Sequence, residues 1–355
     1  MDTKAARSLT GHLDESEAAG MLMLPSDRAE AEACRRRLRS GELVRPLPGL
    51  YARWAHWEGL TPDARHLEKV RALARSHPDW VFGSFSAALV HGLPVSYRLL
   101  DAVHLVVPAR GGVRVRRGIV RHGAVGAIEA EVVDGVRVTP LVQTVADCLR
   151  ATDLRGGLPI ADAALARLDI PLDAFLALIA HRAMGRRGAR QAIRTASWAD
   201  PRAESGGESL ARAIMIEEGF QIPDLQAEFD DPLEPGRVIR VDMLFRRADG
   251  SLVAGEVDGA GKYRDPAMLR GRTTGQALMA ERRRESHINA MDIPVLRLPA
   301  EKLEVTGFVA RTLEAFRIPR EAALGARLAA PMPSPRSIVE RFNGFGDAAG
   351  AFAEG

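Results

Sequence analysis

Hydrophobic and polar positions alternate along the chain with two different periods, which predict helices and strands. Near the N-terminus, apolar residues recur at helical spacing over residues 16–24 and 27–39, and Ser26 is in position to cap the second helix. The run GELVRPLPGLYAR at 41–53 instead alternates apolar residues with turn residues, which is typical of a hairpin. We therefore expect two helices followed by a two-stranded hairpin.

Arginines gather on the second of these helices and on the hairpin. Two helices followed by a basic hairpin are the order of a winged helix-turn-helix, which we predict over residues 1–60. In such a fold the second helix meets the major groove of DNA and the hairpin reaches phosphates. A solvated charged helix face explains the same pattern, so both interpretations stay open. The candidate DNA-contacting residues of this segment are Arg35, Arg36, Arg37, Arg39, Arg45 and Arg53.

The middle of the chain mixes the two periods, so we expect an α/β region over residues 61–200. The run VRVRRGIVRH at 113–122 reads as one strand. A basic segment at 184–205 leads to the C-terminal third; its Arg187 is a candidate DNA contact, and solubilising a connecting helix is the alternative role. The other predicted elements are helices at 61–75, 84–91, 140–150, 158–167 and 172–183, a strand at 102–108, and a run at 132–139 whose two strand-like halves are separated by a turn at Asp134-Gly135.

The C-terminal third has the clearest order of elements. We place a domain boundary near residues 199–203 and a domain over 201–317. Beyond Pro319 the residues Ala, Gly and Pro dominate, so we expect a partly helical, weakly ordered tail over 318–355. The whole chain is predicted to be a multidomain protein of mixed α/β class. The domain reads as helix 204–219, strands 225–229, 238–245 and 252–258, helix 266–291, strand 293–299 and helix 300–316.

Composition narrows the classes of protein that fit. The chain has 355 residues, and 49 Lys and Arg against 46 Asp and Glu leave a net charge of +3. Cys34 and Cys148 lie far apart without a CxxC spacing, which argues against a disulfide scaffold or a zinc site. No run of about 18 apolar residues occurs, and the N-terminus lacks the apolar core of a signal peptide. We therefore expect a cytoplasmic protein without a membrane partner.

Four acidic residues in the C-terminal third fall on successive predicted elements. Asp242 lies in the apolar strand RVIRVDMLF, where a buried carboxylate needs a cation or a hydrogen-bond network. Glu256 and Asp258 lie two apart at the end of the next strand, so their side chains share a face. Glu208 lies on the preceding helix. Each acid alone is explained by a cap, a turn or an ion pair, but the four together favour a site for Mg²⁺ or Mn²⁺, with Lys262 as a charge near a scissile phosphate.

This region resembles the PD-(D/E)XK nuclease superfamily, and within it the Vsr-like endonuclease-type domains. The resemblance covers residues 203–303 and rests on the order αβββαβ with the motifs ESGGES, VD, EVDG, ERRRES and PVLRLP. It implies that Asp242 and Glu256 are metal ligands and that Glu208 is the acid of the first helix. Asp258 then occupies the position usually held by a lysine. A carboxylate cannot supply that positive charge, so Lys262 or Arg283 supplies it from another position, or hydrolysis is weak or lost. Arg283 is also a candidate DNA contact.

The N-terminal half resembles a second family, the AbiEi-type antitoxins of type IV toxin-antitoxin systems. The resemblance covers residues 16–167 and rests on EACRRRLRSGELVRPLPGLYA, SAALVHGLPV, VHLVVP and VDGVRVTPLVQTVADCLR. It implies a winged helix similar to a promoter-binding module, followed by a larger domain. It also implies DNA as a partner, together with a cognate toxin or a second copy of the chain.

Two functions follow from these patterns. The first is a DNA-binding protein with a Mg²⁺-dependent endonuclease-like domain that hydrolyses phosphodiester bonds. The alternative is a non-catalytic DNA-binding antitoxin or transcriptional regulator with a vestigial nuclease fold. A nucleotide or small-molecule enzyme has little support, because the sequence contains no GxxxxGK[ST] motif, no GxGxxG after a strand and no nucleophile elbow.

Overall fold

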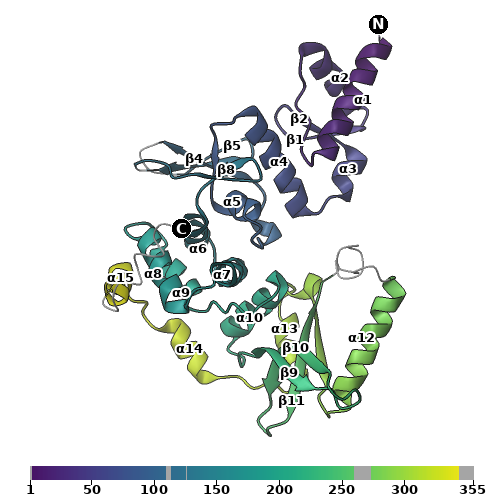
Figure 1. Ribbon diagram of the computed structural model, residues 1–355. Helices are drawn as coiled ribbons and strands as arrows, with labels where there is room; N and C mark the ends of the chain where they lie inside the picture. The colour runs from purple at the N-terminus through teal and green to yellow at the C-terminus, as the bar shows by residue number, and fades with distance from the viewer. Residues whose placement is uncertain (1, 109–112, 125, 260–272, 344–355) are drawn as a thin grey trace. The chain divides into compact units, whose positions relative to one another are not determined.

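A computed structural model describes residues 2–108, 113–124, 126–259 and 273–343. The chain divides into two compact units, Met1–Ala151 and Thr152–Gly355, hereafter unit 1 and unit 2 (Figure 1). Both combine helices with strands, which confirms the predicted mixed α/β class. The division falls well before the boundary predicted near residues 199–203, because the helices that follow residue 152 pack with the C-terminal part of the chain.

Unit 1 begins with two helices and a hairpin, as expected, but the first helix lies earlier than predicted. The helix predicted at 16–24 is wrong, since the chain leaves helix α1 at Ala18 and turns at Gly20, which has a φ of +60°. The apolar residues beyond this turn are extended, and Met23 forms a β-bridge with Tyr51. The bounds are α1 Asp2–Ala18, α2 Arg28–Arg39, β1 Leu43–Leu47 and β2 Leu50–Arg53.

The second helix is capped by Asp27 rather than by the predicted Ser26. The Asp27 carboxylate accepts a hydrogen bond from the backbone N–H of Glu30 at 2.7 Å. The hydroxyl of Ser26 instead donates to the Glu30 carboxylate at 2.8 Å. Asp27 therefore caps the backbone of the first helical turn, whereas Ser26, one residue earlier, binds the Glu30 side chain of that turn.

A six-stranded sheet forms the rest of unit 1, with strand order β5-β6-β4-β3-β8-β7. Leu47 and Leu50 of the hairpin belong to the same hydrophobic core as Phe82 and Val103 of the sheet, so the two parts of unit 1 share one core. The strands are β3 Val81–Phe82, β4 Val103–Pro108, β5 Val113–Arg116, β6 Ile119–Ala124, β7 Glu131–Val133 and β8 Val136–Val138. The helices are α3 Trp54–Gly59, α4 Pro62–Ser76, α5 Ser84–Val90 and α6 Leu141–Ala151.

The single strand predicted at 113–122 is wrong, because the chain folds back within it. Arg117 and Gly118 have φ angles of +50° and +75°, and Arg116 pairs with Ile119 in an antiparallel ladder. Two consecutive residues with positive φ are the geometry of a tight hairpin turn that matches strand twist. The run therefore forms the hairpin β5–β6.

A chain of hydrogen-bonded histidines lies in the interior of unit 1. His66 Nδ1 donates to the carbonyl oxygen of Leu100 at 3.0 Å, so its Nε2 accepts from the Ser86 hydroxyl at 2.8 Å. The Ser86 oxygen in turn accepts from the backbone N–H of His104 at 2.8 Å, and His104 Nδ1 lies 2.9 Å from His122 Nε2. Burial lowers the pKa of His66 to about 4 and that of His104 to about 3, so both rings are neutral at pH 7.

We expect unit 1 to lose stability as the pH falls below 6.5, the ordinary pKa of histidine. The unfolded chain takes up protons there while folded His66 stays neutral until about pH 4. The free energy of unfolding should therefore fall by about 1.4 kcal/mol per pH unit for each such histidine. Urea titrations followed by tryptophan fluorescence measure this, because three of the four tryptophans, Trp54, Trp57 and Trp80, lie in unit 1.

His66→Gln should reduce this pH dependence by about one proton, whereas replacement of the exposed His77 by Gln should leave it unchanged. An equal pH dependence in the wild type and in His66→Gln would contradict a neutral buried ring.

Unit 2 begins with three helices, and the C-terminal helices pack on them. Leu324 of α14 joins Leu158 and Trp198 in one hydrophobic cluster, and the Arg327 guanidinium lies 3.8 Å from the centroid of the Trp198 ring. The tail, which was expected to be partly helical, contains two helices over the part that the structure describes. The bounds are α7 Leu154–Leu168, α8 Leu172–Ala183, α9 Ala189–Ala196, α14 Ala322–Ala329 and α15 Pro335–Asn343.

A buried ion pair joins these helices to the C-terminal domain. Asp162 on α7 accepts from Arg212 Nη1 at 2.7 Å, and the two side chains are 1% and 4% exposed. The second oxygen of Asp162 accepts from the backbone N–H of Asp200 at 2.9 Å, and Arg212 Nη2 donates to the carbonyl of Trp198 at 3.0 Å. Removing either partner would leave an uncompensated buried charge, so this pair holds the helix α10 (Gly206–Glu218) against α7.

Candidate functional site

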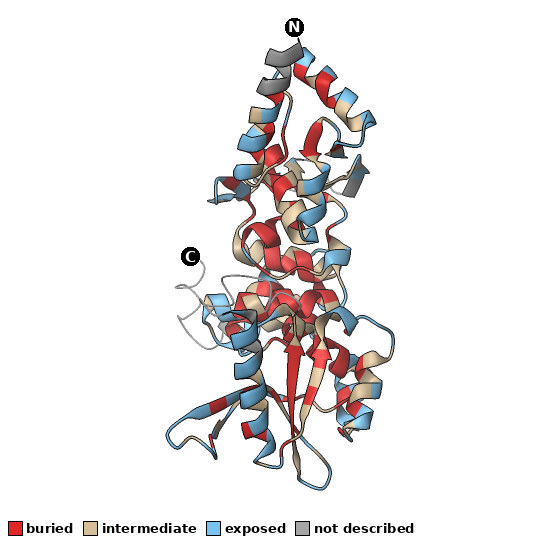
Figure 2. Cartoon of the chain, turned by 90° about the vertical axis from the view of Figure 1, so that its right-hand side faces the viewer, coloured by how far each residue is buried: buried red, intermediate tan, exposed pale blue. Residues whose placement is uncertain are grey.

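The four-stranded sheet of unit 2 has the order β12-β11-β10-β9, in which β9, β10 and β11 are antiparallel and β12 is parallel to β11. Helices α10 and α13 share a core with one face, and Ile288 of α12 packs on the other. Figure 2 shows buried residues concentrated on the inner strands and helices. The chain order is therefore the predicted αβββαβ. The bounds are β9 Asp224–Asp230, β10 Val238–Arg246, β11 Leu252–Asp258, α12 Thr274–Asn289, β12 Val295–Pro299 and α13 Phe308–Ala315.

Glu208 lies at the start of α10, where its carboxylate accepts hydrogen bonds from residues just before the helix. The Ser205 hydroxyl donates to Glu208 Oε1 at 2.7 Å, and the backbone N–H of Glu204 donates to Oε2 at 3.0 Å. Gln226 Nε2 on β9 donates to the same Oε2 at 3.2 Å. Burial raises the pKa of Glu208, and the charge of Asp242 adds to the rise, so these two carboxylates are neighbours.

Glu256 lies on the other side of the sheet, facing α12. Its side chain is 2% exposed and forms an ion pair with Arg284 of α12, while Arg297 Nη1 lies 3.3 Å from Oε2. Burial raises the pKa of Glu256, and the charges of the two arginines oppose this rise. Both oxygens of this carboxylate therefore already face cations supplied by the chain.

Arg297 is the centre of an ion-pair network that extends beyond Glu256. It lies 3.0 Å from Asp258, 2.9 Å from Glu281 and 2.9 Å from Glu285. The pKa of Glu281 is lowered, because hydrogen bonds from Arg297 and the charge of Arg284 outweigh its burial. Asp258 thus binds an arginine from the adjacent strand β12.

Sequence reasoning did not single out Arg297. The signal was nevertheless present, since PVLRLP places one charged residue inside an otherwise apolar strand. Such a residue is buried along its stem and needs an acidic partner. The sequence could not show which acids these are, because they lie 12 to 39 residues away.

The predicted metal ligands Glu208, Asp242 and Glu256 do not meet at one point. Among the described residues, no group of three or more His, Cys, Asp or Glu side chains is placed to hold a metal ion. Glu256 pairs with arginines and Glu208 accepts hydrogen bonds, so the three carboxylates as they lie do not fit a Mg²⁺ bound by all of them. Lys262 lies outside the described residues, and Arg283 forms an exposed ion pair with Glu234.

The predicted DNA-contacting arginines of unit 1 divide into exposed and paired groups. Arg37 lies 2.9 Å from Glu42. Arg53 lies 2.7 Å from Asp14 and 2.6 Å from Glu17, so its charge is balanced within unit 1 rather than offered to phosphates. The remaining candidates of unit 1, and Arg187 in unit 2, present exposed side chains: Arg35, Arg36, Arg39, Arg45 and Arg187.

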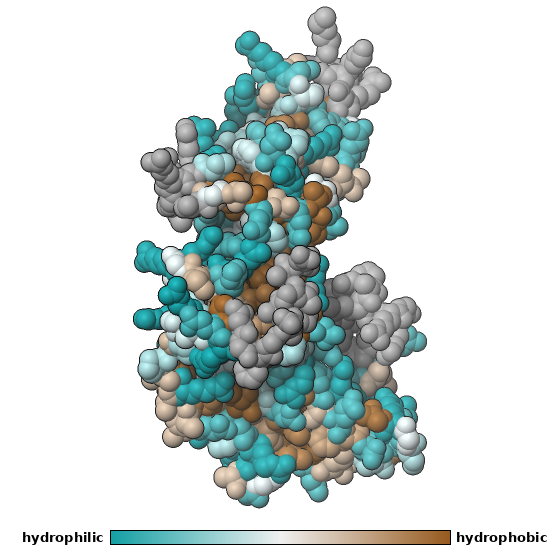
Figure 3. Space-filling view, turned by 60° about the vertical axis from the view of Figure 1, so that its left-hand side comes forward, coloured by the Kyte–Doolittle hydropathy of each residue, from teal (hydrophilic) through white to brown (hydrophobic). Residues whose placement is uncertain are grey.

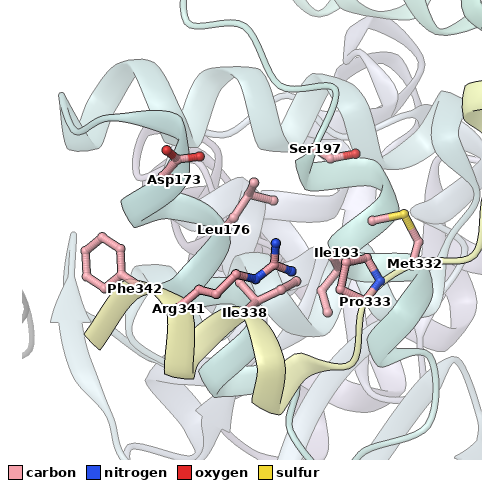
Figure 4. Close-up of a pocket in the computed structure, with 9 residues that line it drawn as sticks. All are labelled: Asp173, Leu176, Ile193, Ser197, Met332, Pro333, Ile338, Arg341 and Phe342. Carbon is pink, nitrogen blue, oxygen red and sulfur yellow. The ribbon is translucent and has the colours of Figure 1, made fainter. Parts of the chain in front are cut away.

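Unit 2 also contains a cavity of about 550 Å³ at the C-terminal helix (Figure 4). Ile338, Arg341 and Phe342 of α15 face Leu176 of α8 and Ile193 of α9 across it. The walls are mainly apolar, with the charges of Asp173 and Arg341 exposed at its edge. Such a lining suits an apolar ligand and offers no acidic cluster for phosphodiester chemistry, so the cavity is separate from the predicted nuclease centre.

The surface gives no sign of a membrane-spanning helix. Within the described ranges, none of the helices is both long and apolar enough to cross a bilayer. The face seen in Figure 3 is covered mainly by hydrophilic side chains.

Fold and site together define a mixed α/β protein whose unit 2 has the order αβββαβ and an acidic centre occupied by arginines. Two proteins of Mycobacterium tuberculosis are similar to it, the uncharacterized protein MT2308 of strain CDC 1551 and the uncharacterized protein Rv2248 of strain H37Rv. Each is 31% identical over 240 residues, which span 66% of this chain and 81% of the relative. The chain belongs to the same family as these proteins. No model of a known protein family matches the sequence, and no solved structure matches it.

We expect Arg297→Gln to lower the free energy of unfolding of unit 2 by on the order of 3 kcal/mol, because it leaves Glu256 buried with one cation fewer. Arg283→Gln is the matched control, since its ion pair with Glu234 is exposed and should contribute less than about 1 kcal/mol. Urea unfolding followed by circular dichroism measures both. Equal effects of the two substitutions would contradict a central role for Arg297.

Proposed function

We propose that this protein is a DNA-binding regulator whose unit 2 has a nuclease-like fold with a closed acidic centre. The observation that carries the proposal is the engagement of Glu256 by Arg284 and Arg297. A metal ion would have to displace two guanidinium groups from a buried carboxylate, and each displaced arginine would lose charge-assisted hydrogen bonds. In this arrangement the acids hold α12 and β12 together.

DNA binding is assigned to unit 1 and to the exposed arginines of α2. Arg35 and Arg39 are four residues apart and share one face of the helix, with Arg36 beside them. All three lie in the second half of α2, so three positive charges gather toward its C-terminal end. Exposed, clustered arginines bind phosphates well, because the guanidinium group is planar and always charged. The resemblance to AbiEi-type antitoxins makes a cognate toxin the expected protein partner.

We expect the triple variant R35Q/R36Q/R39Q to bind duplex DNA more weakly at every salt concentration. If each arginine neutralises one phosphate, the slope of log K against log salt should decrease in magnitude by about 2 to 3. Fluorescence anisotropy with a labelled duplex, titrated at several salt concentrations, measures this slope.

The control R75Q/R137Q/R282Q removes the same charge from exposed positions elsewhere. It should keep most of the wild-type slope. If both triple variants lose the same slope, the binding reflects net charge alone and α2 is not the DNA-binding face.

A second candidate function is the Mg²⁺-dependent hydrolysis of DNA, with Mn²⁺ as a substitute. Two observations favour it: the αβββαβ order, and the proximity of Asp242 to Glu208. Beside them, Gln226 Oε1 is buried and accepts no hydrogen bond from the described part of the chain. These oxygens are of the kind that magnesium prefers. Hydrolysis at a metal bound by these oxygens and Glu256 would require Glu256 to break its ion pairs with Arg284 and Arg297.

A cleavage assay distinguishes the two functions. The wild-type protein is incubated with duplex, single-stranded and mismatched DNA in Mg²⁺ or Mn²⁺, and cleavage of the DNA is measured. We expect no cleavage if the acidic centre is closed. Cleavage that is lost in Asp242→Asn and Glu256→Gln, but kept in the exposed control Asp230→Asn, would replace the regulator with the nuclease. Loss of cleavage should then exceed about a hundredfold, as expected when a charge-stabilising group is removed.

A further inference from the structure

Unit 1 contains a pocket of its own, and none of its lining residues belongs to α2. Its volume is about 270 Å³. Three segments meet there: the turn of the hairpin β1–β2, the end of α4, and the turn of the hairpin β5–β6. The lining residues are Leu47, Pro48, Leu73, His77, Trp80, Arg117, Ile119 and Arg121.

The backbone fixes the position of the two arginines in this pocket. Gly118 packs so closely on the hairpin that a Cβ atom added there would lie 2.9 Å from Leu47 Cδ2. Arg117 precedes this glycine in the tight turn, so its backbone cannot move away from Leu47. Arg121 lies two residues after Ile119 on β6, so both side chains point to the same face of the strand.

One wall of the pocket is aromatic. The rings of His77 and Trp80 are stacked, with centroids 3.9 Å apart and planes inclined by 13°. Trp80 is partly exposed, whereas Leu47 and Leu73 are buried and form an apolar floor. A flat aromatic surface above an apolar floor suits the face of a planar ring system.

Within the described residues, the positive charge of the pocket has no acidic partner. Neither Arg117 nor Arg121 forms an ion pair or hydrogen bond with any residue that the structure describes. Other arginines of unit 1 behave differently: Arg65 donates to the carbonyl of Trp57 at 2.8 Å, and Arg71 donates to the carbonyl of Gly20 at 3.2 Å. The pocket therefore combines two available guanidinium groups with an aromatic wall.

We propose that this pocket binds one nucleotide, with its phosphate on Arg117 and Arg121 and its base against the His77 and Trp80 wall. Guanidinium groups bind phosphate oxygens bidentately, and bases stack on aromatic side chains regardless of sequence. The nucleotide is either a free mononucleotide or one unit of a single-stranded segment of DNA. In the second case the site rests on the proposed DNA-binding function and extends it to unpaired strands.

Calorimetric titration of the full-length protein with 5′-deoxyadenosine monophosphate tests the site. Deoxyadenosine and inorganic phosphate are the comparison ligands, and each should bind more weakly than the nucleotide because each lacks one of the two contacts. Replacing Arg117 or Arg121 by Gln, or Trp80 by Ala, should weaken nucleotide binding by about tenfold, the effect of one stacking or charge-assisted contact.

The matched control is Arg137→Gln, since Arg137 is exposed on β8 of the same sheet but outside the pocket. Circular dichroism of every variant verifies folding, and Trp80→Phe, which keeps an aromatic wall, should bind nearly as well as the wild type. Equal binding of nucleotide and nucleoside, or equal weakening by Arg137→Gln, would overturn the proposal. So would the absence of any nucleotide binding.

Titration with a single-stranded oligonucleotide shows whether the pocket binds a free mononucleotide or one unit of a DNA strand. Tighter binding of the oligonucleotide than of the mononucleotide, lost in Arg121→Gln, assigns the pocket to DNA, and the reverse order assigns it to a free nucleotide. Duplex binding through α2 is measured separately with R35Q/R36Q/R39Q. If the pocket binds no nucleotide, the result of the duplex-binding assay is unaffected. If α2 does not bind duplex DNA, the result of the mononucleotide titration is unaffected.

Discussion

The need to compensate buried carboxylates governs the structure of unit 2. Removing an ionised carboxylate from water costs several kcal/mol unless a cation or hydrogen-bond donors replace the lost hydration. Asp162 satisfies this requirement through Arg212, and Glu256 through Arg284 and Arg297. In each case the partner lies on a different element, so compensating the charge also joins those elements. The helical layer, the sheet and α12 are held together at the points where acids are buried.

Because of the same requirement, arginine side chains and a metal ion compete for the same carboxylates. A carboxylate that pairs with arginine stabilises the fold but has few lone pairs left for a metal ion. Arg297 links four acids between the sheet and α12, and Asp258, which the nuclease resemblance aligns with a lysine, is one of them. The positive charge near this centre therefore comes from β12 rather than from a lysine on β11. A nuclease with this sequence would have to open the network, whereas a regulator would keep it closed.

The buried histidines of unit 1 carry no charge at pH 7. Burial lowers the pKa of His66 and His104, so both rings are neutral. Positive charge lies outside, on the exposed arginines of α2 and in the pocket that contains Arg117 and Arg121. The small net charge of the chain thus conceals local clusters of arginine. Positive charge beside an aromatic surface is the combination with which proteins bind single-stranded nucleic acids.

The sequence by itself determined the mixed α/β class, the αβββαβ order and the elements that carry Glu208, Asp242 and Glu256, because periodicity reports which face of an element is apolar. Only the tertiary structure decided which charges meet. Arg284 and Arg297 reach Glu256 and Asp258 across 28 and 39 residues, and Arg212 reaches Asp162 across 50. The early end of α1 and the turn within 113–122 also depended on the backbone at Gly20 and Gly118. A local pattern shows that a buried charge needs a partner, but its identity is set by the packing of distant elements, which no local spacing records.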